Sequence, residues 1–335
     1  MKIVFVAPYS LPFRAGGFES QVYHIFSELQ TLGVDVVWHN FENSNLDGVD
    51  ILQVMATDPS MLPMIKKAKS KGIKVVMTPM QGSRARTNSH YKRCLLLSKI
   101  PQFCTGHKMN FETIRNADFF TPLCSFEAQR LTDVYGINKD CISIIPNGLD
   151  ESYLNEEVLE KNLPFKDYLL VVGRIEKNKN QKTLIEVAKK LNKKVLIVGE
   201  AGDKNDGYLE ECKNIANDDI YFWGIEKNPY VMKYLYRNAK LTVIPSFSEM
   251  VPLVVFESLS QITPVVCTNR CGISNDQIPG VLFSDISKRA LINSISRMLD
   301  FNKQTITHQG VYSWKNIAEM YNTVYNIVLN NGIIR

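Results

Sequence analysis

Residues 241–257 read LTVIPSFSEMVPLVVFE, a pattern that predicts a strand, a turn and a helix. The apolar run 241–245 predicts a buried strand, and Pro252 predicts the first residue of a helix, where a missing N–H costs nothing. Glu249 then lies on the turn before the helix, and Glu257 lies about one and a half turns inside it. A buried strand followed by a tight turn and a helix is the repeating unit of a parallel α/β sheet.

Two carboxylates beside a helix N-terminus suit a ligand in which hydroxyl pairs flank a diphosphate. Carboxylates accept hydrogen bonds from vicinal hydroxyls, and helix N–H groups, here of Met250, Val251 and Leu253, bind phosphate oxygens. Alternatively, Glu257 is an ordinary helical glutamate and Glu249 is a first-turn acid that complements the helix dipole. Taken alone, the second interpretation is the stronger, because glutamates eight residues apart are common, so the decision depends on the rest of the chain.

Composition places the chain among globular proteins large enough for two domains. It has 335 residues, of which 45% are apolar and 22% charged. The first residues form a short apolar run without signal-peptide features, and no run reaches membrane-spanning length. The seven cysteines show no metal-type pairing and the five histidines no metal-ligand spacing. We therefore expect reduced thiols, no metal, and a cytoplasmic location.

Apolar strands alternate with amphipathic helices over residues 2–122 and again over 168–267, which predicts two doubly wound parallel sheets. A Pro-Asn-Gly turn sets the boundary between domains 1–150 and 151–311, and the apolar face of 312–335 is expected to return to the first domain. The expected strands are 2–7, 34–38, 51–54, 74–78, 119–122, 168–172, 194–198, 220–222, 241–244 and 264–267. The expected helices are 19–32, 61–70, 181–191, 207–214, 228–238, 252–260 and 312–329.

A series of landmarks runs from end to end of the chain. They are Gly16-Gly17, Ala117-Asp118 with 125–127, 145–150, Gly173-Arg174 with Lys179, 222–224, 249–257 and the helix at Trp314. Their order resembles that of retaining glycosyltransferases with the GT-B fold, in the bacterial group called family 4. The resemblance implies two Rossmann-like domains facing a cleft, with the acceptor bound mainly by the first domain and a nucleotide-sugar donor by the second.

The resemblance also implies roles for individual residues. Arg174 and Lys179 would neutralise the departing diphosphate, as a fork-shaped donor and a point charge can, and Glu249 would contact the donor sugar. Glu257 would hold the ribose. The alternative for the two cations is a solvated basic loop, and for the glycines a tight turn. The other donor-side residues are Gly17, Gly173, Gly224, Ile225, Met250, Val251 and Leu253.

Two places depart from the family pattern. After the strand 74–78 many members carry a histidine that contacts the transferred sugar, whereas this chain has Gln81. Gln81 could substitute as a hydrogen-bond donor; alternatively the chain belongs to a subgroup without that histidine or is weakly active. The loop 269–275 keeps Gly272 but not the usual glycine pair followed by an acid, so we assign it no role. The acceptor-side candidates are Gln81, Arg84 and His107, the last of which we place in a polar loop.

The stretch 84–99 mixes Arg and Lys with Tyr91 and several leucines. This composition suits an anionic membrane surface or a phosphate-bearing acceptor, and the bland alternative is a solvated basic loop. No nucleic-acid-binding motif accompanies it. The expected partners are therefore a nucleotide-sugar donor, most readily UDP- or GDP-linked, and a saccharide or undecaprenyl-linked acceptor. Peripheral contact with the inner membrane surface is expected, with no nucleic acid and no separate cofactor.

The function that the resemblance implies is sugar transfer with retention of anomeric configuration, in synthesis of capsule, O-antigen or exopolysaccharide. Two alternatives stay open: a catalytically inactive paralogue that binds sugar nucleotide or glycan, and a GT-B sugar-nucleotide epimerase. A dinucleotide oxidoreductase would share the doubly wound pattern, but neither opening strand is followed by Gly-x-Gly-x-x-Gly.

Overall fold

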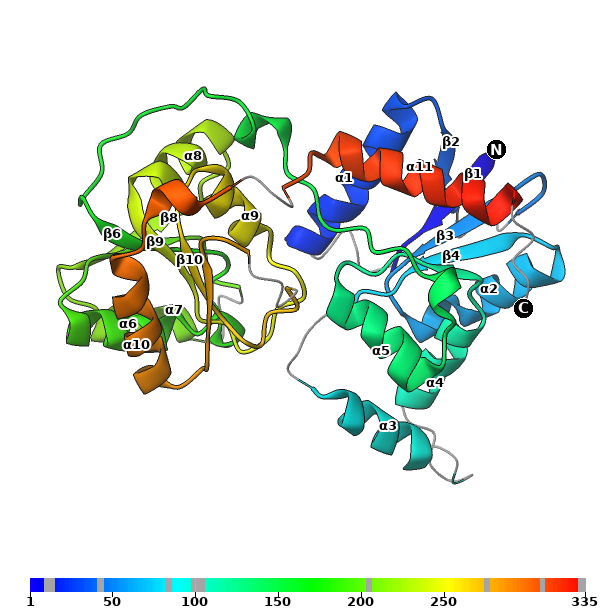
Figure 1. The fold of residues 1–335 in the computed structure, drawn as a ribbon, viewed down its shortest axis with the longest axis horizontal. Helices are drawn as coiled ribbons and strands as arrows, with labels where there is room; N and C mark the ends of the chain where they lie inside the picture. The colour runs from blue at the N-terminus through cyan, green and yellow to red at the C-terminus, as the bar shows by residue number, and fades with distance from the viewer. Residues whose placement is uncertain are drawn as a thin grey trace. The chain divides into compact units, whose positions relative to one another are not determined.

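The computed structural model describes residues 1–8, 16–40, 45–81, 86–97, 100, 106–202, 207–273, 278–307 and 311–330. Contacts divide the chain into two compact units: Met1–Gly148 with Tyr312–Arg335, and Leu149–Val311. Each unit contains one parallel sheet with helices on both faces, so the predicted pair of doubly wound α/β domains is confirmed (Figure 1). Within the described residues, no helix has the length and apolar character needed to cross a bilayer.

The first unit is built on a five-stranded sheet in the order β2-β1-β3-β4-β5. Its strands are β1 (Lys2–Val6), β2 (Asp35–Trp38), β3 (Ile51–Met55), β4 (Lys74–Thr78) and β5 (Phe119–Phe120). Its helices are α1 (Gly17–Thr31), α2 (Leu62–Ser70), α3 (Asn88–Leu97), α4 (Gly106–Arg115), α5 (Ser125–Tyr135) and α11 (Trp314–Asn330). Helices α2, α4 and α5 supply the apolar core on one face, and α1 packs with α11 on the other.

Buried hydroxyl groups attach α11 to the first sheet. The Tyr325 hydroxyl donates to Oε1 of the buried Gln53 at 3.1 Å, and the Tyr321 hydroxyl lies 2.8 Å from Thr78 Oγ1. Gln53 Nε2 donates to the same threonine oxygen at 3.1 Å. Because buried polar groups need partners, this network fixes α11 in one position on the sheet. The expected return of the final helix to the first unit is therefore confirmed.

The Pro-Asn-Gly turn at the end of the first segment needs its glycine. A Cβ on Gly148 would lie 2.7–2.9 Å from three atoms of Trp314, the first residue of α11. The Trp314 ring also stacks on His24 of α1, with ring centroids 5.1 Å apart. A side chain at position 148 would therefore push α11 away from α1.

The second unit is built on a six-stranded sheet in the order β11-β10-β9-β6-β7-β8. Its strands are β6 (Tyr168–Val172), β7 (Val195–Val198), β8 (Ile220–Gly224), β9 (Ala239–Ile244), β10 (Val265–Thr268) and β11 (Val281–Ser284). Its helices are α6 (Gln181–Leu191), α7 (Tyr208–Ile215), α8 (Pro229–Asn238), α9 (Leu253–Ser260) and α10 (Lys288–Leu299). Side chains of α6, α7 and α10 fill the core on one face of the sheet, and those of α8 and α9 pack on the other.

Several local expectations are wrong. Pro252 is the N-cap residue with an extended ψ of 123°, so α9 begins one residue later than expected. The stretch 84–99 includes α3, where the sequence analysis names no helix; no side chain of α3 is buried, so it lacks the apolar stripe of a core-facing helix. His107 lies in the first turn of α4 and not in a loop. Strand β11 was not predicted, because its apolar run is only three residues long, and three of its four residues are partly buried.

Candidate functional site

Three neighbouring strands of the second sheet end in glycines. Gly173 follows β6, Gly199 follows β7 and Gly224 ends β8, and their φ angles are 138°, 143° and 87°. The Gly199 N–H donates to the Gly224 carbonyl at 2.8 Å, and a Cβ on Gly199 would lie 2.0 Å from the Gly173 carbonyl oxygen. We call these three residues the glycine ledge. It is a backbone surface without side chains at the carboxyl ends of the strands, the edge where doubly wound sheets bind ligands.

Lys179 lies over the glycine ledge. Its Cε and Nζ atoms lie 3.6 and 3.8 Å from the position that a Cβ on Gly173 would occupy. Its Nζ forms an ion pair with Glu249 Oε1 at 2.5 Å, and the two side chains are only 22% and 13% exposed. The Ser246 hydroxyl donates to the same Oε1 at 2.8 Å. The structure thus brings Glu249 together with Gly173 and Lys179, which belong to a different landmark of the sequence.

Backbone contacts between two loops position this ion pair. The short 3₁₀ turn Lys177–Lys179 follows β6, and the turn that carries Glu249 follows the neighbouring strand β9. Asn178 Nδ2 donates to the Ser248 carbonyl at 2.9 Å, and the Phe247 N–H donates to the Asn178 carbonyl at 2.8 Å. The two loops that carry Lys179 and Glu249 are therefore joined by one side-chain and one backbone hydrogen bond, as a pre-organised site requires.

The loop after β10 braces Glu249 from the other side. The Gly272 N–H donates to the carbonyl oxygens of Glu249 at 3.1 Å and Met250 at 2.6 Å. The backbone of Cys271 also forms a bridge with Glu249. Residues 269–273, to which the sequence analysis assigned no role, therefore fix the backbone beneath the carboxylate. Residues 274 and 275 of the same loop lie outside the described residues.

Arg174 directly follows the first glycine of the ledge and is more open to solvent. Its side chain is 55% exposed, and Nη2 lies 3.5 Å from Glu176 Oε1. At this distance and exposure the ion pair contributes little to stability. The backbone of Arg174 is better fixed, because Gln181 Nε2 donates to its carbonyl at 2.8 Å. The Arg174 backbone is therefore fixed next to the glycine ledge, whereas its exposed guanidinium is able to turn toward an anion.

Glu257 lies on α9, apart from the Lys179–Glu249 pair in sequence, and is held by a tyrosine of α8. The hydroxyl of the buried Tyr236 on α8 donates to Glu257 Oε2 at 2.6 Å. Burial raises the pKa of Glu257, and the Tyr236 hydrogen bond acts in the opposite direction. A carboxylate held in such surroundings is costly unless something stabilises its charge. A ligand hydroxyl donating to Glu257 would supply that stabilisation.

The remaining donor-side residues fall around the same sheet edge or at the start of α1. Ile225 follows the last glycine of the ledge and is 47% exposed. Met250 and Val251 lie in the turn before α9, and Leu253 is its first residue. Gly17 opens α1 in the first unit.

On the acceptor side, Gln81 has a structural role that the sequence analysis missed. Its Oε1 accepts a hydrogen bond from the Tyr135 hydroxyl at 2.8 Å. Its backbone N–H donates to the buried Glu127, and its carbonyl accepts from the buried Arg130. Of the other acceptor-side candidates, Arg84 lies outside the described residues, and His107 lies on α4.

Comparison with known families places this geometry in context. Residues 156–308 match the family model of glycosyl transferases group 1. The match contains the glycine ledge, the Lys179–Glu249 pair and Glu257, and it lies wholly inside the second unit.

Individual relatives are distant in sequence. A Segniliparus rotundus protein named D-inositol 3-phosphate glycosyltransferase is 24% identical over 248 residues, which cover 67% of this chain and 55% of the relative. A Campylobacter jejuni enzyme named N-acetylgalactosamine-N,N'-diacetylbacillosaminyl-diphospho-undecaprenol 4-alpha-N-acetylgalactosaminyltransferase is 27% identical over 195 residues, covering 56% and 52%. The chain thus spans about half the length of these curated relatives.

A solved structure is similar over nearly the whole chain. The crystal structure of Anabaena HepE in complex with UDP and glucose has a TM-score of 0.65 and 13% identity, covering 96% of this chain and 98% of that one. At this identity the likeness concerns the fold alone. Together with the two Rossmann-like units, it shows a fold of the GT-B type.

Proposed function

We propose that this chain is a glycosyltransferase that takes a sugar from a nucleoside-diphosphate donor bound by its second unit. One observation carries the proposal: a pre-organised Lys179–Glu249 pair lies over the glycine ledge, within the segment that matches glycosyl transferases group 1. A ledge without side chains lets a diphosphate come close to the backbone, and the ammonium beside it supplies positive charge.

Lys179 and Arg174 would stabilise the negative charge of the departing diphosphate. When the bond between the anomeric carbon and the diphosphate oxygen breaks, negative charge grows on the leaving group. The Lys179 ammonium has three N–H donors, and Glu249 accepts from it and holds it in place. The half-exposed Arg174 guanidinium offers a planar fork that matches two phosphate oxygens. We therefore propose that these side chains stabilise the leaving group and that transfer is metal-independent.

The two glutamates would bind the hydroxyls on either side of the diphosphate. Glu249, fixed by Lys179 and Ser246, would accept hydrogen bonds from the transferred sugar. Glu257, fixed by Tyr236, would accept from the ribose. We propose that the acceptor attacks from the face on which the diphosphate departs, so that the anomeric configuration is retained.

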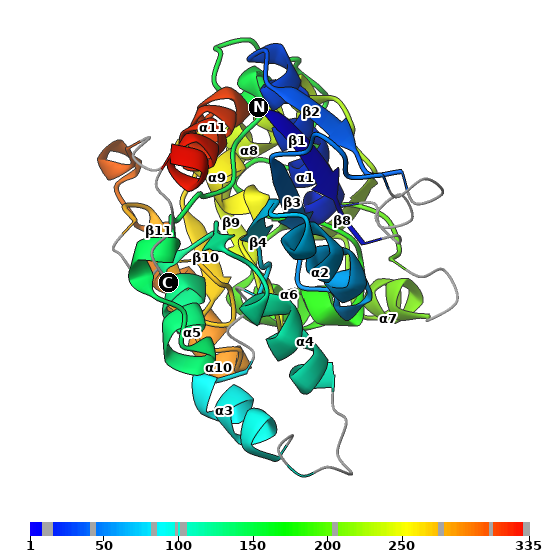
Figure 2. The same ribbon diagram turned by 90° about the vertical axis from the view of Figure 1, so that its right-hand side faces the viewer.

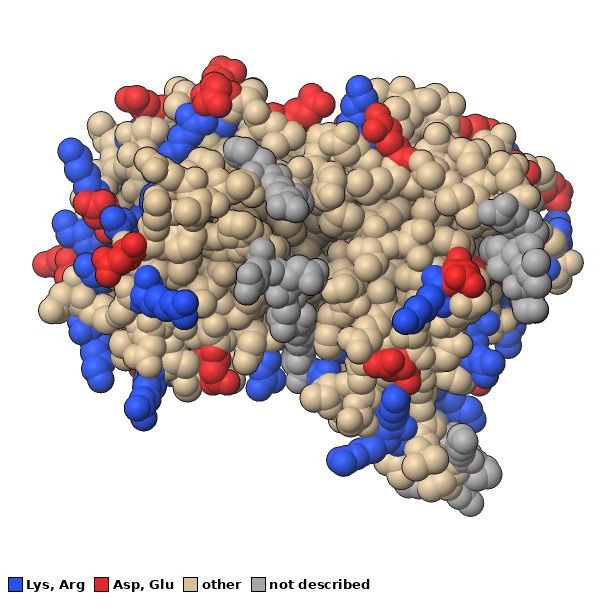
Figure 3. Space-filling model, viewed as in Figure 1, with Lys and Arg blue, Asp and Glu red and all other residues tan. Residues whose placement is uncertain are grey.

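For the partners, we propose a UDP- or GDP-linked donor and a saccharide or undecaprenyl-linked acceptor bound by the first unit, in surface-polysaccharide synthesis at the inner membrane. The two curated relatives differ here, since one is named for an inositol phosphate and the other for a diphospho-undecaprenol. The described part of the basic stretch favours a lipid-linked acceptor. On α3, Leu96 and Leu97 are 64% and 55% exposed, and such apolar side chains suit contact with a lipid. Figure 3 shows Lys and Arg side chains gathered around the region of α3 and α4.

Turnover with defined substrates tests this proposal. The protein is incubated with UDP- and GDP-sugars and with three acceptors: an undecaprenyl-diphosphate saccharide, the free saccharide, and inositol 3-phosphate. We expect transfer to the lipid-linked saccharide, with the donor's anomeric configuration kept in the product by NMR. Epimerised sugar nucleotide without transfer would identify an epimerase. A bound nucleotide with no product from any acceptor would identify an inactive paralogue.

Replacing Glu257 with glutamine should change protein stability and donor binding in opposite directions. Because burial raises the Glu257 pKa, the folded state binds this proton more tightly than the unfolded state. The stability that the protonated group confers is present at acid pH and is lost as pH rises through the raised pKa. Glu257→Gln should therefore raise the melting temperature at neutral pH, have little effect near about pH 4, and weaken donor binding.

The matched control is Glu160→Gln, at an exposed position outside the helices and strands. It should change neither the melting temperature nor donor affinity. A Glu257→Gln protein that is less stable at neutral pH would contradict the raised pKa of Glu257. Donor binding as tight as that of the wild type would show that the carboxylate has no binding role.

A further inference from the structure

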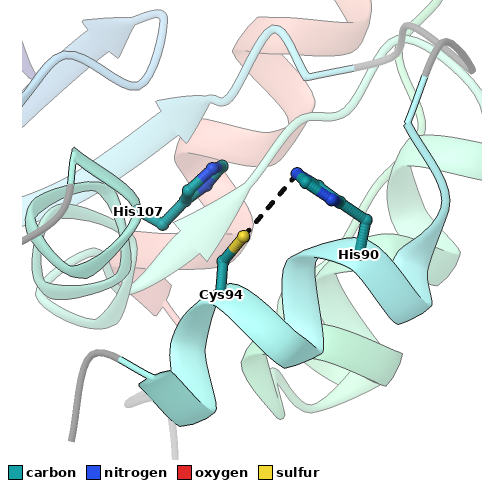
Figure 4. A group of neighbouring side chains, drawn as sticks. All are labelled: His90, Cys94 and His107. Atoms are coloured by element: carbon teal, nitrogen blue, oxygen red, sulfur yellow. Dashed lines mark hydrogen bonds between the residues drawn. The ribbon is translucent and has the colours of Figure 1, made fainter. Parts of the chain in front are cut away.

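Two helices of the first unit bring together three side chains of metal-binding type. His90 and Cys94 lie four residues apart on α3, and His107 lies in the first turn of α4. One ligand atom from each residue lies within 4.8 Å of the other two. Figure 4 shows the three side chains pointing toward one another across the space between the two helices.

The separations suit a tetrahedral site. Cys94 Sγ lies 3.6 Å from His90 Nε2. Bond lengths of about 2.3 Å for Zn–S and about 2.0–2.1 Å for Zn–N, at a tetrahedral angle, place the two ligand atoms about 3.6 Å apart. The imidazole rings of His90 and His107 have centroids 5.8 Å apart. A ring nitrogen of His107 lies within 4.8 Å of both the Cys94 sulfur and the His90 ligand atom.

We propose that His90, Cys94 and His107 bind one Zn²⁺ ion, with a water molecule in the fourth position. A thiolate and two imidazoles form a ligand set that zinc prefers over calcium or magnesium, which take oxygen ligands. His90 is exposed, while Cys94 and His107 are partly buried, so an ion can enter from solvent. This site goes beyond the proposed glycosyl transfer and does not depend on it.

The site would strengthen the attachment of α3, which lies at the surface of the first unit. None of the side chains of α3 is buried, and the helix contacts α4 and α5 of the first unit. Figures 1 and 2 both show it at the margin of that unit, away from the sheet. Leu95 packs, partly buried, against the core of the first unit, and the Arg130 guanidinium of α5 lies 4.5 Å from the centre of the Tyr91 ring. A metal bond from α3 to α4 would add to these contacts.

Charge limits the expected affinity. Arg86, Lys92 and Arg93 are exposed on or beside α3, and their positive charges oppose a divalent cation. The Cys94 thiolate neutralises one of the two charges of the ion, and solvent screens the exposed cations. We therefore expect zinc to bind less tightly here than in a closed site with four protein ligands.

The sequence contained a signal for this site. His90 and Cys94 are spaced by one helical turn, which places both on one face of a helix. The signal was missed because no helix was expected in this stretch and because His107 comes from a second helix.

Metal binding to the full chain without an affinity tag tests the proposal. The metal-free protein is titrated with Zn²⁺ against a chromophoric chelator, and bound metal is counted by mass spectrometry. We expect one zinc per chain in the wild type. Cys94→Ser and His107→Ala should bind at least about tenfold more weakly. Cys141→Ser and His39→Gln, at partly buried positions elsewhere in the first unit, should bind as the wild type does.

Two further readouts exclude a folding artefact. Circular dichroism and the melting temperature of the metal-free variants should match those of the metal-free wild type. Co²⁺ should give a thiolate charge-transfer band that Cys94→Ser lacks, and Zn²⁺ should slow hydrogen exchange in α3 of the wild type only. The proposal is overturned if the wild type binds no zinc, or if Cys94→Ser retains zinc with wild-type affinity and no cobalt band distinguishes the two proteins.

Discussion

Replacing Lys179 with alanine should lower kcat for sugar transfer by about 100-fold or more, the effect of removing one pre-organised charge donor from a developing anion. Lys179 is held over Gly173 by Glu249, with both side chains mostly shielded from water. In such a site an ammonium acts on the leaving group at full strength, because the protein has already fixed its position. The measurement is steady-state release of nucleoside diphosphate at saturating donor.

Lys177→Ala is the matched control for this variant. Lys177 is exposed and belongs to the same 3₁₀ turn, so its loss removes a similar charge from the same loop. It should leave kcat within about twofold of wild type, the range usual for an exposed surface charge. Lys179→Gln removes the charge but keeps a hydrogen-bond donor for Glu249. A low kcat in this variant as well would therefore reflect the lost charge and not a general folding defect. Equal kcat values for the two alanine variants would remove Lys179 from the mechanism.

Replacing Gly199 with alanine should destabilise the second unit by about 4 kcal/mol. The added Cβ would lie 2.0 Å from the Gly173 carbonyl oxygen, and the φ of 143° is one that side chains rarely adopt. Neither strand can yield easily, because β6 and β7 are buried and paired over four residues. The measurement is the change in free energy of unfolding in urea.

Gly207→Ala separates backbone strain from steric clash. Gly207 also has a positive φ, of 69°, but open space surrounds its Cβ position. The Gly207→Ala variant should lose only about 1–2 kcal/mol of its free energy of unfolding, which is the cost of placing a residue with a side chain in a left-handed conformation. Similar losses for both variants would show that the glycine ledge is not closely packed.

The two sheets could be predicted because buried parallel strands appear in a sequence as short apolar runs. β6 and β7 are almost completely buried and were recognised. β11 was not, because its apolar run covers only three residues, 281–283, and is shorter than the runs typical of strands. The tyrosines of α11 fitted an apolar helical face, but their hydroxyl bonds to Gln53 and Thr78 depend on a contact with distant strands.

The members of the candidate site could be named from the sequence, but their pairing could not. Lys179 and Glu249 are 70 residues apart and meet because β6 and β9 are neighbours in the sheet. Strand order is a property of the tertiary fold and has no local signature. For the same reason the bracing of Glu249 by Gly272 was missed, since it depends on the pairing of β9 with β10.

The central claim is that the carboxyl edge of the second sheet binds a nucleoside diphosphate, and ligand-induced stabilisation tests it most directly. UDP, GDP, dTDP, CDP, ADP and NAD are compared in wild-type and Lys179→Ala protein by thermal shift. One nucleoside diphosphate should stabilise the wild type by about 2.7 kcal/mol at 100 times its dissociation constant, and clearly less in the variant. Stabilisation by NAD alone, or by a nucleoside diphosphate equally in both proteins, would contradict the account.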